Sequence, residues 1–194
     1  MDKKIGLFWL RDDFRLTKNY GLAEATAKHN QVVVFYLYKQ NVYKDREAQK
    51  WWLSKSLLNF QKKLNDLNIS LQIIEVSSFK IFFDTLIKKK DFAIYWNKVY
   101  EPDYLKFDKY LISILKNNNI YHKRFKGNAL NEIDEIKKND GTPFKVFTPF
   151  WRSAEKYYLE KISSKEKVIK KCNKKIIFFK NCIESKKILP KKNW

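Results

Sequence analysis

Glycine is rare in this chain of 194 residues, and its scarcity excludes the common nucleotide-binding loops. The four glycines are Gly6, Gly21, Gly127 and Gly141. No two of them are close enough to form a G-x-G-x-x-G motif or a P-loop. Dinucleotide binding of the Rossmann type and Walker-type NTP hydrolysis are therefore excluded. A G-x-S-x-G elbow and an H-E-x-x-H helix are also absent, and we predict no catalytic residue in this chain.

Cysteine and long apolar runs are equally scarce. Cys172 and Cys182 lie ten positions apart without a neighbouring histidine, and this spacing fits no zinc site. We therefore predict no bound metal and two free thiols. Free thiols are typical of a cytoplasmic protein, which is the predicted location. Asp12 and Asp13 could hold Mg²⁺, but surface acids in a helix-entry turn are the favoured interpretation. The longest apolar runs, such as 32–37, are far shorter than the roughly 18 residues of a membrane span, and no membrane partner is expected.

Positive charge is abundant and unevenly distributed. The formal net charge is +20, and half of this excess falls in the last 43 residues, which hold 14 basic and 4 acidic side chains. One explanation is the coding bias of an AT-rich gene, which enriches lysine together with asparagine and isoleucine. The other is attraction to a polyanion, with nucleic acid as the first candidate.

Short apolar strands alternate with amphipathic helices along the first two thirds of the chain. This order predicts a doubly wound five-stranded parallel α/β sheet with helices on both faces, which is Rossmann-like without a glycine-rich phosphate loop. Ligands in such sheets bind beyond the carboxyl ends of the strands. We expect one domain over 1–130 and an interdomain linker region with short helices over 131–194. The predicted strands are 4–10, 31–37, 70–76, 92–97 and 120–125, and the predicted helices are 19–29, 47–67, 78–89, 103–117 and 150–161.

Three strings carry a family resemblance. They are residues 8–16 (FWLRDDFRL), 95–102 (YWNKVYEP) and 141–152 (GTPFKVFTPFWR). In this order they resemble the N-terminal half of the DNA photolyase/cryptochrome family, and the third is the most specific. Residues 48–53 resemble the start of the family's long helix, and 188–194 resemble the linker that precedes its helical domain.

The resemblance implies a light-dependent DNA-repair enzyme that splits pyrimidine dimers with an excited reduced FAD. In that family FAD lies in a C-terminal helical domain, and the N-terminal α/β domain carries a light-harvesting antenna chromophore. Because the resemblance ends where the helical domain begins, we expect this chain to be the antenna portion and to have no repair activity alone. The alternative is a basic nucleic-acid-binding or docking half of a split photolyase, with the FAD-binding helical domain encoded separately.

The resemblance also implies candidate antenna-binding residues. In folate-binding relatives the chromophore, methenyltetrahydrofolate, contacts positions that match Asp103 and Tyr104, and Tyr104 lacks the usual carboxylate. In deazaflavin- or flavin-binding relatives the matching neighbourhood is Phe35, Tyr36 and Lys50. These five residues are the antenna candidates.

A second set of candidates is structural or interfacial. Arg11, Asp12 and Arg15 are expected to brace the turn after the first strand. An aromatic group near residue 150 is expected to face the helical domain that the resemblance implies. The remaining members of this set are Asn97, Glu101, Phe147, Phe150 and Trp151.

Overall fold

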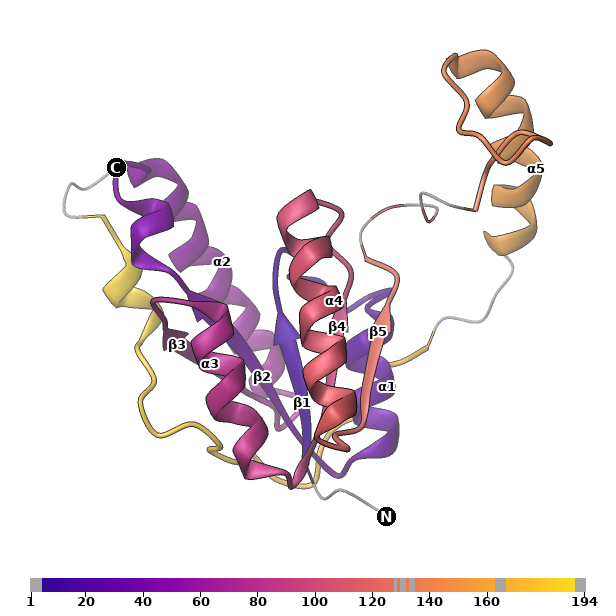
Figure 1. The fold of residues 1–194 in the computed structure, drawn as a ribbon. Coiled ribbons are helices and arrows are strands. Elements are labelled where there is room, and N and C mark those ends of the chain that lie inside the picture. The colour runs from indigo at the N-terminus through magenta and orange to yellow at the C-terminus, as the bar shows by residue number, and fades with distance from the viewer. Residues whose placement is uncertain (1–4, 128, 130–131, 133–134, 163–166, 191–194) are drawn as a thin grey trace. The chain divides into compact units, whose positions relative to one another are not determined.

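The computed structural model describes residues 5–127, 129, 132, 135–162 and 167–190. Five parallel strands form one sheet in the order β3-β2-β1-β4-β5 (Figure 1). This order confirms the predicted doubly wound sheet. The strands are β1 (Ile5–Leu10), β2 (Gln31–Tyr38), β3 (Ser70–Glu75), β4 (Phe92–Asn97) and β5 (His122–Phe125). The helices that connect them are α1 (Tyr20–Lys28), α2 (Glu47–Asn65), α3 (Phe79–Leu86) and α4 (Pro102–Asn117), with short 3₁₀ turns at Gln40–Tyr43 and Ile87–Lys89.

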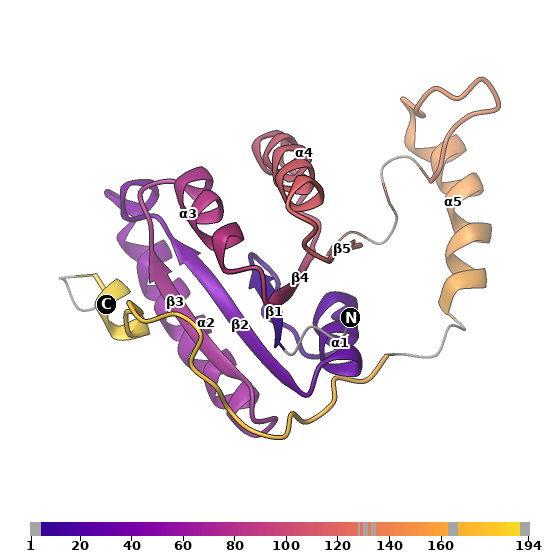
Figure 2. The same cartoon turned by 60° about the horizontal axis from the view of Figure 1, so that its bottom comes forward.

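Two apolar layers cover the two faces of the sheet. Helices α1 and α2 contribute residues such as Leu22 and Leu57 to one layer, and α3 and α4 contribute Phe83 and Leu111 to the other. The central strands are buried on both faces because neighbouring residues point to opposite layers. In Figure 2, α1 and α2 lie on one side of the sheet, and α3 and α4 lie on the other.

Local chemistry explains where the predicted elements begin and end. Asn19 caps α1, because its side-chain oxygen accepts the backbone N–H of Leu22 at 3.1 Å. Pro102 occupies the first turn of α4, where no intrahelical donor is needed. Helix α2 ends two residues before its predicted end, and the chain then turns through Asn68 at a φ of 55°.

The domain boundary at residue 130 stays a prediction. The described residues 167–190 group with 5–127 in one compact unit, and a second unit lies within 128–166. We call residues 167–190 the edge segment, because its middle part, residues 176–183, is hydrogen-bonded to the outer strand β3. The side-chain oxygen of Gln72 accepts the N–H groups of both Phe178 and Phe179, and Ile183 pairs with Ile73 in an antiparallel bridge.

The second unit contains helix α5 (Phe147–Ile162). It begins three residues before the predicted start, since Pro149 falls in the first turn, where a missing N–H is tolerated. Phe147 stacks on Trp151 with an interplanar angle of 11°. Residues 191–194, the end of the string that resembles the linker, lie outside the described residues. Among those that are described, no helix is both long and apolar enough to cross a membrane.

Candidate functional site at the carboxyl ends of the strands

A pocket of about 610 Å³ opens at the carboxyl ends of the strands. The loop after β1, the end of β2 with its 3₁₀ turn, and the first turns of α3 and α4 supply its walls. This is the position at which doubly wound sheets bind ligands. Its lining residues are Asp12, Tyr36, Leu37, Lys39, Val42, Tyr43, Arg46, Ser78, Phe79, Lys80, Glu101, Asp103, Tyr104 and Phe107.

The structure brings three of the five antenna candidates together in this pocket, namely Tyr36, Asp103 and Tyr104. It places the other two elsewhere. Phe35 is fully buried in the layer between the sheet and helices α3 and α4, where its ring contacts Phe82, Phe83 and Phe179. Lys50 donates a hydrogen bond to the backbone oxygen of Lys44 and is not among the lining residues.

Aromatic rings form the apolar part of the pocket. Phe79 and Phe107 contact each other at 5.8 Å between ring centroids, and Tyr104 lies 6.1 Å from Phe79. Burial raises the pKa of Tyr104 to about 12, so its hydroxyl is neutral and able to donate a hydrogen bond at physiological pH. These rings can pack against a planar ligand, and the phenol can bind a polar atom at its edge.

Charged groups of both signs line the same pocket. Asp12, Glu101 and Asp103 supply carboxylates. The cationic lining residues are Lys39, Arg46 and Lys80. Carboxylates accept hydrogen bonds from ring N–H groups, and the cations can bind a phosphate or carboxylate tail. The pocket therefore fits a planar heteroaromatic ring that carries both N–H donors and an anionic tail.

The pKa of Asp12, one of the pocket carboxylates, is raised. Burial is the main cause, and the nearby charge of Glu101 adds to it while Arg11 opposes it. A raised folded-state pKa means that ionised Asp12 costs stability above its unfolded pKa of about 3.9. We expect Asp12→Asn to raise the melting temperature at pH 7 and to raise it less at pH 3.5, as measured by thermal unfolding at both values. An equal gain at the two pH values would contradict this assignment.

A cluster of buried charged residues packs next to the pocket. Arg11 is 5% exposed and donates to the backbone oxygen of Asn97 at 2.8 Å, and its guanidinium lies 3.2 Å from the fully buried Asp108. Arg124 contacts the same carboxylate at 3.2 Å. The Arg11 guanidinium also lies 5.3 Å from the centroid of Tyr104. Arg11 therefore ties β1, β4 and α4 together beneath a ring that lines the pocket.

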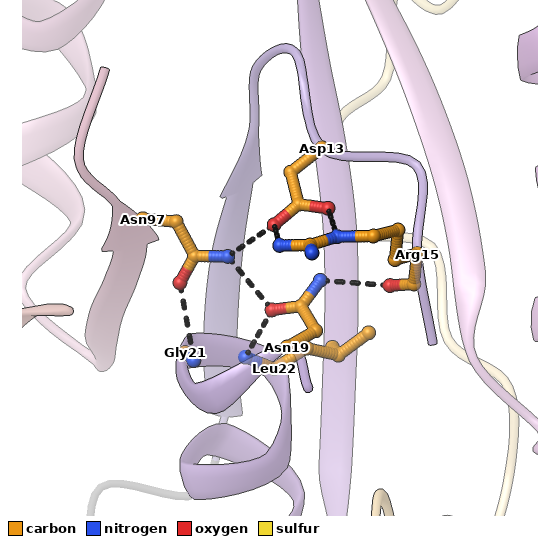
Figure 3. Close-up of polar contacts among 6 residues, drawn as sticks. All are labelled: Asp13, Arg15, Asn19, Gly21, Leu22 and Asn97. Atoms are coloured by element: carbon orange, nitrogen blue, oxygen red, sulfur yellow. Dashed lines mark hydrogen bonds and ion pairs between the residues drawn. The ribbon is translucent and has the colours of Figure 1, made fainter. Parts of the chain in front are cut away.

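A second polar cluster surrounds Asn97 at the end of β4 (Figure 3). Its side-chain oxygen accepts the N–H of Gly21 at 3.2 Å, and its amide nitrogen donates to Asp13 at 3.1 Å and to Asn19 at 2.9 Å. A Cβ on Gly21 would lie 2.6 Å from that oxygen, so the approach requires glycine. Arg15 pairs with Asp13 at 2.6 Å.

Side chains of this cluster accept free N–H groups at the N-terminus of α1. In dinucleotide-binding sheets the first helix offers its free N–H groups to a phosphate. Here the side chains of Asn19 and Asn97 accept the N–H groups of Leu22 and Gly21. The structure thus gives a physical reason, besides the missing glycine motif, for excluding Rossmann-type dinucleotide binding.

Sequence reasoning missed much of the pocket wall. Phe79, Phe107 and Arg46 line the pocket, but none of them was among the predicted site residues. Phe147, Phe150 and Trp151 belong to the second unit, where Phe147 is 71% exposed and Trp151 is 43% exposed.

Among the described residues no group of three or more His, Cys, Asp or Glu side chains could hold a metal ion.

The protein family of this chain is established by a match to a family model over most of its length. The family described as "DNA photolyase" matches residues 6–168. This chain belongs to the DNA photolyase family. Deoxyribodipyrimidine photo-lyases of Agrobacterium fabrum and Synechococcus sp. are 28% and 25% identical to it over 149 and 150 residues. Cryptochrome-1 of Arabidopsis thaliana is 26% identical over 150 residues.

Solved structures agree with this photolyase fold. The bacterial class III photolyase of Agrobacterium tumefaciens matches 97% of this chain with a TM-score of 0.78 and 25% identity, and 39% of its own length is covered. The Synechocystis cryptochrome matches 98% of this chain with a TM-score of 0.75 at 18% identity, with 41% of its own length covered. The chain spans 31% of each of the two curated photo-lyases, which corresponds to their N-terminal portion.

Proposed function

We propose that this chain is the light-harvesting portion of a DNA photolyase and that its pocket binds the antenna chromophore. The observation that carries the proposal is the 610 Å³ pocket at the carboxyl ends of β1, β2 and β4, which joins aromatic rings to charges of both signs. An absorbed photon would be passed to FAD in the helical domain, where pyrimidine dimers in DNA are split. The chain alone is then expected to bind a chromophore and to repair no DNA.

The lining residues narrow the chemical class of the chromophore. Phe79, Phe107 and Tyr104 can hold the faces of a planar ring, while Asp12 and Asp103 can accept hydrogen bonds from its N–H groups. Lys39 and Arg46 can then neutralise a phosphate or glutamate tail. Flavins, deazaflavins and folates share this chemistry. An archaeal photolyase from Sulfolobus tokodaii, which contains two FAD molecules that imply a novel light-harvesting cofactor, shares the fold with a TM-score of 0.64 at 20% identity.

A direct test is retention of a chromophore by the purified chain. FMN, a deazaflavin and 5,10-methenyltetrahydrofolate are each mixed with the protein and passed through gel filtration. The proposal expects a near-UV or blue absorption band to elute with the protein at about one chromophore per chain for at least one of the three. Elution of all three entirely apart from the protein would refute it.

The exposed aromatics of α5 support a second function, docking of the FAD-binding helical domain. Phe147 and Trp151 form a stacked pair in the second unit, and large exposed apolar surfaces mark interaction sites. In this interpretation the second unit is an interdomain segment that docks on the helical domain. Co-purification with a co-expressed helical domain tests this function, and its loss in a Phe147→Ser variant is the expected result.

A further inference from the structure

The edge segment presents lysines from a backbone that is fixed to the sheet. Its N–H groups and carbonyls bond to several elements of the first unit, including Lys170 N–H to Thr26 at 3.0 Å and Cys172 N–H to Leu67 at 2.8 Å. Ser54 on α2 donates to the carbonyl of Ser185 at 2.7 Å. These bonds lie at intervals from residue 170 to residue 185, so most of the segment is held in place. Figure 2 shows its course beside β3.

Side chains of the edge segment separate by type. Those that are buried are apolar or small, namely Ile169, Cys172, Phe179, Ser185 and Ile188. The segment holds eight lysines and a single acid, Glu184. Lys167 pairs with Glu24 at 3.0 Å. The other seven lysines are exposed, namely Lys170, Lys171, Lys174, Lys175, Lys180, Lys186 and Lys187.

Helix α2 adds further positive charge beside this row. Lys62 and Lys63 are exposed in its last turn, just before Leu67, whose carbonyl accepts the N–H of Cys172. The nearby acid Glu24 is already engaged by Lys123 and Lys167, both at 3.0 Å. The outer edge of the sheet therefore carries a concentrated positive charge.

We propose that the edge segment is a binding surface for the phosphate backbone of duplex DNA. Lysine is a compact point charge that contacts phosphates without reading bases, so the surface would give sequence-independent affinity. The ten residue steps from Lys170 to Lys180 span at most about 35 Å, which is close to one turn of B-DNA. DNA is favoured over other polyanions because the chain belongs to a DNA photolyase family.

The surface is separate from the chromophore pocket. None of the pocket's lining residues lies within 167–190. DNA binding here therefore does not depend on chromophore binding, and either proposal can fail while the other stands.

The test uses two variants with the same change in net charge. Lys171→Glu/Lys174→Glu/Lys175→Glu reverses three charges of the edge segment, and Lys106→Glu/Lys109→Glu/Lys116→Glu reverses three exposed charges on α4. Binding to a fluorescein-labelled 20-base-pair duplex is measured by anisotropy at several salt concentrations from 50 to 200 mM. Circular dichroism checks that both variants fold, and Lys→Gln versions of both serve if either Glu variant does not.

We expect the edge variant to lose at least tenfold in affinity at 50 mM salt and the α4 variant less than twofold. The slope of log K against log salt should become shallower by about 3 in the edge variant alone, because each lost phosphate contact removes about 0.9. Equal losses in the two variants, or no DNA binding by the wild-type chain, would overturn the proposal. So would binding of this segment to anionic lipid vesicles without binding to DNA.

Discussion

Asp108→Ala is expected to lower the free energy of unfolding by about 3–5 kcal/mol, because it leaves a buried cation without its counter-charge. Asp108 is fully buried, and its carboxylate contacts both Arg11 and Arg124 at 3.2 Å. The Arg11 side chain is only 3% exposed, so water cannot replace the lost partner. Burial already lowers the pKa of Arg11, and Asp108 is the main group that opposes this effect.

The measurement is urea unfolding followed by circular dichroism. Glu47→Ala is the matched control, since Glu47 pairs with Lys50 at 3.6 Å on the surface and such pairs contribute about 1 kcal/mol or less. A loss below about 1 kcal/mol for Asp108→Ala would show that the cluster does not support the fold. A second expected result is weaker chromophore binding, because Arg11 lies beneath Tyr104.

Asn97→Ala is expected to cost about 3 kcal/mol, because the truncation removes three hydrogen bonds at once and leaves buried groups unsatisfied. Asn97 is 6% exposed and bonds to Gly21, Asp13 and Asn19 (Figure 3). Without it, the first turn of α1 and the loop after β1 lose their connection to β4.

The control for this substitution is Asn118→Ala. Asn118 is partly buried and makes one side-chain bond, to the carbonyl of Ile114 at 2.8 Å, so its loss should cost about 1 kcal/mol or less. Chemical denaturation of both variants gives the comparison. Similar small losses in the two would mean that the Asn97 cluster holds nothing together.

The sheet and its helices could be predicted because their apolar patterns have the periods of strands and helices. Leu53, Leu57, Phe60 and Leu64 mark one face of α2 in the sequence and form its buried face in the structure. The course of the edge segment could not be predicted in this way, because 167–190 has neither period. It is fixed by tertiary bonds from Ser54, Ser70 and Gln72, which no local pattern reveals.

The candidate pocket could be predicted in part. Tyr36 and Tyr104 were implied by the family resemblance, and they lie at the carboxyl ends of the strands, where sheets of this kind bind ligands. Phe35 and Tyr36 were grouped together, but only Tyr36 reaches the pocket, because the ring of Phe35 is fully buried against other aromatic rings in the layer under α3 and α4. The rings of Phe79 and Phe107 enter through the first turns of α3 and α4, whose placement depends on the crossovers of the whole sheet.

The central claim is that the pocket holds the antenna chromophore, and a pair of tryptophan substitutions tests it most directly. Val42 lines the pocket and is 47% exposed, whereas Ile81 lies on α3 outside the lining and is 62% exposed. Dissociation constants for whichever chromophore the wild-type chain retains are measured by fluorescence titration of both variants. We expect Val42→Trp, which fills the pocket, to weaken binding at least tenfold and Ile81→Trp to change it less than twofold. Unchanged binding in Val42→Trp would contradict the account.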